Sequence, residues 1–110
     1  MGALRMTPEL LAAIAERFKT IAEPARLQIL HALRGGERTV SELVGQTALG
    51  QANVSKHLQL LHAHGFVSRR KEGLYVRYRL ADQDVFRLCD IMCSRLQRDV
   101  ANRRKLLNTG

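Results

Sequence analysis

The segment from Gln51 to His64 combines polar and cationic side chains with an apolar face at helical spacing. Val54, Leu58 and Leu61 fall on one face of the predicted helix. The opposite face carries the amide, hydroxyl, ammonium and imidazole groups of Gln51, Asn53, Ser55, Lys56, His57 and Gln59. Asparagine and glutamine can bond bidentately to adenine, and the other groups can reach bases or phosphates. Any solvated helix also has a polar face, so an interpretation as a DNA-reading helix needs further support.

A second set of candidate contacts is a group of basic side chains near a predicted turn. Residues 66–71 and 74–80 alternate roughly between apolar and polar, and Glu72-Gly73 lies between them, which predicts a two-stranded hairpin. This hairpin would bring to the DNA backbone or the minor groove the side chains of Arg69, Arg70, Lys71 and Arg77. The whole chain has 18 Lys and Arg against 10 Asp and Glu, a formal net charge of +8. Such a balance is typical of polyanion binders, although a merely soluble basic protein would share it.

The two cysteines, Cys89 and Cys93, are candidate sensor or metal-ligating residues. Their i, i+4 spacing places both thiols on one face of a predicted last helix, within an apolar stripe. Thiolates suit As(III), Sb(III), Cd(II) or Cu(I). They also react with oxidants to form disulfides. Here such a disulfide would join two copies of the chain, because a disulfide within one helical turn has poor geometry. Cysteine is equally common as a small buried hydrophobe, so sensing and packing are both open interpretations.

Five helices and the hairpin are predicted to position these groups. Thr7-Pro8-Glu9 combines an N-cap, a first-turn proline and an acid, and a second helix restarts at Pro24. Thr39-Val40-Ser41-Glu42 is a capping box that begins a short third helix, and residues 51–64 follow after a glycine-containing turn. Asp82 caps the last helix. The order α-α-α-α-β-β-α predicts a mainly α fold with a β-hairpin wing, a winged helix-turn-helix whose fourth helix can enter the major groove.

Three segments in this order resemble the ArsR/SmtB family of metalloregulatory repressors. Residues 23–30, Glu-Pro-Ala-Arg-Leu-Gln-Ile-Leu, are similar to its "DPTRLRIL" signature. Residues 51–67 resemble its recognition helix, and residues 71–80 resemble its wing. The resemblance runs over about residues 8–100. It implies a homodimer held by the first and last helices, which binds an imperfect inverted repeat and releases it when an effector binds.

The metal-site motifs of that family are mostly absent here. Its arsenic site has Cys-x-Cys where this chain has Thr39-Val40-Ser41. Its zinc and nickel site on the last helix corresponds to Asp82, Asp84, Arg95 and Arg98 here, where only the first acid matches and two arginines would repel a cation. We therefore expect no zinc site of the family type. Cys89 and Cys93 are left as the candidate ligands.

The sequence thus predicts a single domain, residues 1–110, that binds a double-stranded DNA operator as a homodimer and represses transcription. An effector, either a thiophilic metal or metalloid or a thiol-reactive species sensed at Cys89 and Cys93, would release it. The alternatives are a constitutive winged-helix regulator whose cysteines only pack, and a protein-binding winged helix. No phosphate loop, Ser-His or Cys-His arrangement or carboxylate pair suggests an enzyme. The absence of a secretory signal or a long apolar segment predicts a cytoplasmic protein with no membrane contact.

Overall fold

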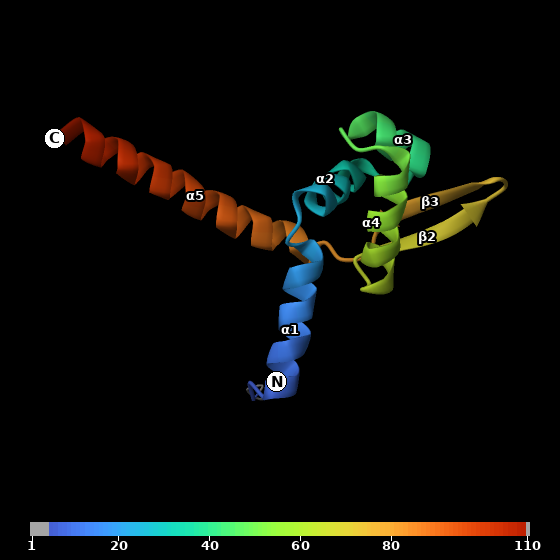
Figure 1. The fold of residues 1–110 in the computed structure, drawn as a ribbon, viewed down its shortest axis with the longest axis horizontal. Helices are drawn as coiled ribbons and strands as arrows, with labels where there is room; N and C mark the ends of the chain where they lie inside the picture. Colours follow the sequence, from blue (N-terminus) through green and yellow to red (C-terminus); the bar gives the residue numbers. More distant parts are fainter. Residues whose placement is uncertain (1–4, 110) are drawn as a thin grey trace.

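The computed structural model describes residues 5–109, with side chains to residue 107. It shows a helical body from which a β-hairpin projects to one side (Figure 1). The elements are α1 (Pro8–Ile21), α2 (Pro24–Ala32), a 3-10 turn η1 (Leu33–Gly35), β1 (Arg38–Thr39), α3 (Val40–Gln46), α4 (Gln51–Ala63), β2 (Val67–Glu72), β3 (Tyr75–Leu80) and α5 (Asp84–Thr109). The predicted order of helices and hairpin is confirmed, and the winged helix-turn-helix is formed by α3, α4 and the β2–β3 wing.

The predicted helix starts are present as hydrogen bonds. The Thr7 hydroxyl accepts the backbone N–H of Leu10 at 3.1 Å at the start of α1. At the start of α3 the capping box is complete, because Thr39 Oγ1 accepts the N–H of Glu42 at 3.2 Å and Glu42 Oε1 accepts the N–H of Thr39 at 3.0 Å. These bonds satisfy backbone donors that the helices leave without partners, so the positions of both helix starts are determined locally.

The core lies between α2, α3, α4 and the sheet. Val54, Leu58 and Leu61 of α4 are all 0% exposed, which confirms the predicted apolar face of this helix. They pack in one cluster with buried residues of the neighbouring elements, namely Ile21, Ile29, Leu30, Leu33, Leu43, Phe66, Val67, Tyr78, Val85 and Phe86. Helix α4 is therefore fixed on the body by its buried face, and most of its opposite face is exposed.

The sheet has three strands in the order β1-β3-β2, all antiparallel. β1 pairs Arg38 with Tyr78, a short strand that the sequence analysis missed because two residues show no alternation. In the wing, Glu72 pairs with Tyr75, so the connecting residues are Gly73 and Leu74, one position later than predicted. Gly73 has φ +59°, a left-handed conformation that favours glycine in such a turn.

Helices α1 and α5 extend away from the winged body (Figure 1). The radius of gyration is 17.7 Å, whereas a compact chain of this length has about 13 Å. On α5, Val85 and Phe86 near its first turn are the buried residues, and the apolar side chains beyond them are open to solvent. No helix in the described part of the chain is long and apolar enough to cross a membrane.

Candidate nucleic-acid interface and effector groove

The polar face of α4 presents most of the predicted DNA-reading side chains to solvent. Gln51, Asn53, Lys56 and Gln59 are exposed, and Ser55 is half-buried. Their amide and ammonium groups are free to meet the acceptor and donor pattern of base edges and phosphates. The placement predicted for these residues is confirmed, while their contact with DNA stays a prediction.

The prediction that His57 lies on this exposed face is wrong, because its side chain is buried and 7% exposed. Its Nδ1 accepts a hydrogen bond from Arg26 Nε at 3.2 Å, and its Nε2 lies 3.6 Å from Glu23 Oε1. Residues 54, 57, 58 and 61 have the i, i+3, i+4, i+7 spacing of a buried stripe. The helical spacing could therefore have predicted that His57 is buried. A buried imidazole needs polar partners, however, and the sequence does not show that Arg26 and Glu23 supply them.

The wing carries two groups of basic side chains with different surroundings. Arg70 pairs with Glu37 at 2.7 Å and with Glu72 at 3.1 Å. Arg77, the cross-strand neighbour of Arg70, pairs with Glu72 at 2.8 Å. Arg70 therefore links the wing to the segment before α3 through Glu37. Arg77 joins the two wing strands through Glu72 and also lies 3.5 Å from Glu42 of α3. Their predicted role as DNA contacts requires that they exchange a carboxylate for a phosphate.

Arg69 and Lys71 form the other group. They lie two residues apart on β2, so their side chains share one face of the wing, and both are exposed. Within residues 5–107 neither has an ion-pair partner. They are the wing cations that are ready to meet a phosphate backbone without breaking an existing contact.

The bond between Arg70 and Glu37 shifts the pKa of both groups in the direction that favours their charged forms. The hydrogen bond from the Arg70 guanidinium, together with its charge, lowers the pKa of Glu37 below its ordinary value, and the same hydrogen bond raises the pKa of Arg70. The pKa of Glu42 is also lowered, first by the backbone N–H of Thr39 in the capping box. The two carboxyl groups thus have lowered pKa values for different reasons.

We expect Arg70→Gln to move the pKa of Glu37 up towards its ordinary value and to leave that of Glu42 nearly unchanged. Because the folded-state pKa of Glu37 is depressed, the stabilisation from this pair is present at neutral pH and is lost as the pH falls through that pKa. An NMR titration of the side-chain carboxyl carbons measures both values in one sample. If the pKa of Glu37 were the same in wild type and variant, Arg70 would not be the cause of its lowered value.

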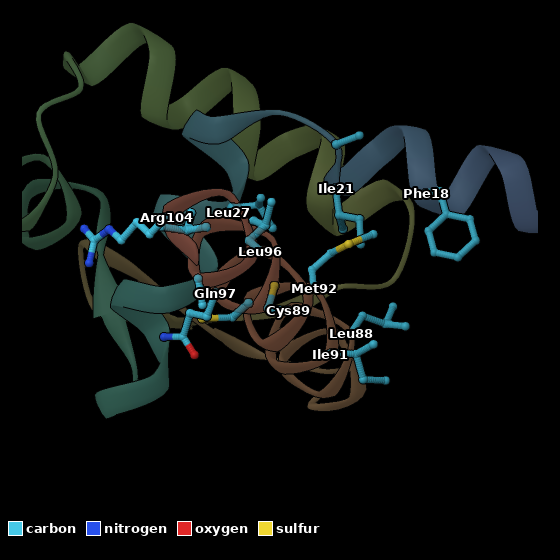
Figure 2. Close-up of a pocket in the computed structure, with 14 residues that line it drawn as sticks. Phe18, Ile21, Leu27, Leu88, Cys89, Ile91, Met92, Leu96, Gln97 and Arg104 are labelled. Atoms are coloured by element: carbon cyan, nitrogen blue, oxygen red, sulfur yellow. The ribbon is translucent and has the colours of Figure 1, made fainter. Parts of the chain in front are cut away.

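An apolar groove of about 970 Å³ lies between α1 and α5. Figure 2 shows side chains from α1, α2 and α5 around it, among them Phe18, Ile21, Leu27, Leu88, Cys89 and Met92. Cys89 is half-buried in its wall, and Cys93, also a lining residue, is exposed. Met92, another lining residue, is 64% exposed in the single chain. The predicted apolar stripe of the last helix is thus present, and in the described part of the chain its side chains beyond the first turn stay open to solvent.

The two free thiols do not form a metal site by themselves. In the described residues there is no group of three or more His, Cys, Asp or Glu side chains that could hold a metal ion. Asp82, the one residue that matches the zinc motif of the resembled family, is paired with Arg17 at 2.7 Å. A soft ion at Cys89 and Cys93 would therefore need further ligands from a second chain or from solvent.

The fold and the exposed face of α4 define a winged helix-turn-helix protein, and comparisons with known proteins give its family. The family model described as "Bacterial regulatory protein, arsR family" matches residues 23–69. The chain is 39% identical over 71 residues to the probable mercury resistance operon repressor of Streptomyces lividans, which covers 64% of this chain and 57% of that protein. It is 42% identical over 74 residues to the transcriptional repressor SmtB of Mycobacterium tuberculosis, or 67% of this chain and 55% of SmtB.

A solved structure matches a larger share of this chain than these two relatives do. The homodimeric winged helix-turn-helix DNA-binding domain Mb0332 of Mycobacterium bovis matches with a TM-score of 0.72 and 33% identity, covering 92% of this chain and 94% of that one. The chain therefore belongs to the ArsR family of bacterial regulatory proteins, which confirms the resemblance seen in the sequence. It spans little more than half the length of the first two relatives. The relatives are transcriptional regulators.

Proposed function

We propose that this protein is a homodimeric transcriptional repressor that binds an inverted repeat in DNA and is released by an effector acting at Cys89 and Cys93. In this proposal residues 1–110 form one DNA-binding domain, and α1 and α5 are its dimerisation elements. The observation that carries the proposal is the uncovered apolar groove between α1 and α5. It lies apart from the DNA-reading face of α4, and both surfaces belong to one chain.

The excess surface of this extended chain has the size that a stable dimer covers. The chain exposes 8318 Å², whereas a compact protein of 12.4 kDa exposes about 6,100 Å². The difference of about 2,200 Å² in total accessible surface is in the range that each partner buries in an obligate homodimer. On α5 the apolar side chains open to solvent include Leu88, Ile91, Met92, Leu96 and Val100. A second copy of the same helices is the occupant we propose, which agrees with the homodimeric state of Mb0332.

In such a dimer the two-fold axis would relate two copies of α4. Recognition helices of this kind bind half-sites about one helical turn of DNA apart, roughly 34 Å. The exposed residues of α4 would read bases, while Arg69 and Lys71 of the wing would contact phosphates. The net charge of +8 favours association with DNA and makes it sensitive to salt.

The effector site would lie where the dimer forms. Cys89 and Cys93 are one turn apart on α5 and both line the groove, so two chains would contribute four thiols. A thiophilic ion such as As(III), Sb(III) or Cd(II), or an oxidant, would join thiols there and change how the two chains pack. The relation to a probable mercury resistance repressor supports a soft ion as the effector class.

A second candidate function is a constitutive repressor whose cysteines only fill the interface. The half-buried position of Cys89 among apolar side chains favours this alternative. Like the first candidate, a constitutive repressor would bind DNA, but no metal ion, metalloid or oxidant would release it.

The experiment is a fluorescence anisotropy titration with duplex DNA from the upstream region of the gene. The protein is measured reduced, with As(III) or Cd(II), and with a mild thiol oxidant. We expect tight binding by the reduced protein, release by one of these agents, and no release of the Cys89→Ser/Cys93→Ser variant. Adding Ser94→Cys to that variant returns one thiol to the same helix outside the groove, and it should not restore release.

The outcomes separate the candidates. Binding without release in both proteins would support the constitutive repressor and overturn sensing at the cysteines. Release of the double variant by the same agent would place the effector elsewhere. No binding to any duplex at low salt would overturn the repressor proposal itself.

A further inference from the structure

Arg17 joins three elements that are far apart in the sequence. Its Nη1 donates a hydrogen bond to the backbone carbonyl of His64 at 3.2 Å. Its Nη2 donates to Oδ2 of Asp82 at 2.7 Å. Its guanidinium carbon lies 4.3 Å from the centre of the Phe66 ring. One side chain of α1 thus contacts His64 at the end of α4, Phe66 just before β2, and Asp82 just before α5.

The two hydrogen bonds act at helix ends. His64 is the C-cap of α4, where carbonyl groups lack intrahelical partners and the helix dipole is negative, so a cation is favourable there. The other oxygen of Asp82 accepts the N–H of Asp84, the first residue of α5, at 2.9 Å. The planar guanidinium can hold both groups in a fixed geometry, which the ammonium of a lysine cannot do.

Helix α1 has few other contacts that could set its direction. Its buried residues are Thr20 and Ile21, both in the last turn. The rest of the helix projects away from the winged body (Figure 1). The angle between α1 and α4 therefore depends on the last turn of α1 and on Arg17, one turn before its end.

A small change of this angle would matter at the DNA-reading end of α4. The helix has 13 residues, which corresponds to a length of about 20 Å. A tilt of about 10° at the His64 end would move the other end by about 3 Å, close to the 3.4 Å rise of one base pair. In a dimer built through α1 and α5, this angle decides how far apart the two recognition helices lie.

We propose that Arg17 is a positioning residue that sets the half-site spacing at which the dimer binds DNA. The inference rests on the proposed function, since it needs a dimer with two recognition helices. It adds a role for a residue that lies on α1, outside both the exposed face of α4 and the lining of the groove.

The test compares three variants on a ladder of duplexes. The probe is the tightest duplex recovered by in vitro selection from a random library of about 30 base pairs, long enough for two half-sites. Its halves are then moved by one or two base pairs, and a duplex with one half-site is added. Arg17→Gln removes the guanidinium, and Asp82→Asn removes its ion pair. Lys19→Gln is the matched control, because it removes the same charge from an exposed side chain of α1.

We expect wild type and Lys19→Gln to bind the selected spacing about tenfold or more tightly than spacings shifted by one base pair, because each step also rotates the half-site by about 35°. For Arg17→Gln and Asp82→Asn the ratio should fall to about threefold, while affinity for the single half-site changes by less than about twofold. Thermal melting monitored by circular dichroism reports whether each variant is folded. If Arg17→Gln does not fold, Asp82→Asn provides the measurement.

Two results would overturn the inference. One is a spacing profile of the folded variants equal to that of Lys19→Gln. The other is an equal loss of affinity on every duplex, the single half-site included, which indicates a general structural role. A wild-type protein that selects no duplex over random DNA would overturn the proposed function as well, and this result is recognised before any variant is made.

Discussion

Leu96→Glu is expected to convert the protein to a monomer and to weaken its binding to an inverted repeat by about a hundredfold or more, because the second half-site then has to be bound independently. Leu96 lines the groove between α1 and α5 and is 62% exposed in the single chain. A carboxylate there would have to be desolvated when a second copy covers the groove. Sedimentation equilibrium measures the oligomeric state, and anisotropy measures the affinity.

Ser94→Glu is the matched control for this prediction. It adds the same charge on the same helix at an exposed residue that does not line the groove, so the dimer and its affinity should persist. Binding of a single half-site by the Leu96→Glu variant should stay close to that of wild type, because α4 and the wing are unchanged. A Leu96→Glu protein that remains dimeric would contradict the proposal that a second copy covers the groove.

Leu58→Ala is expected to lower the free energy of unfolding by about 2–5 kcal/mol, the usual cost of removing most of a fully buried leucine. Leu58 is 0% exposed and lies in the core beneath the exposed polar face of α4. A small domain has only about 5–15 kcal/mol of stability in total, so this loss would leave much of the protein unfolded at elevated temperature. Urea denaturation followed by circular dichroism gives the difference.

The control is the next residue along the chain. Gln59 is exposed, so Gln59→Ala should change the free energy of unfolding by less than about 0.5 kcal/mol. Both variants are compared with wild type at one fixed protein concentration, because dimerisation contributes to the apparent stability. A loss below about 1 kcal/mol for Leu58→Ala would mean that the core collapses around the missing side chain more completely than buried leucine sites usually do.

The local features of this fold were predictable because they depend on residues close in the sequence. The capping box of Thr39 and Glu42 uses a spacing of three residues, and it begins α3 as predicted. The apolar positions of α4 follow helical periodicity, which identified its buried leucines and, by exclusion, most of its exposed side chains. The ArsR-family resemblance rested on the same kind of information, and the comparisons confirm it.

The tertiary structure alone decided which side chains meet across long separations. His57 and its partner Arg26 are 31 residues apart, and this contact accompanies burial of the histidine, which was predicted on the exposed polar face. Arg70 and Glu37 are 33 residues apart, and their ion pair divides the wing cations into two groups.

Arg17 and Asp82 are 65 residues apart, and only the packed structure brings helix α1 to the start of α5. The physical reason is common to all three contacts. Periodicity and capping report the face and the limits of an element, because the backbone geometry that they reflect is local. The partner of a polar side chain depends instead on how whole elements pack, and that is set by the shape of the shared apolar core.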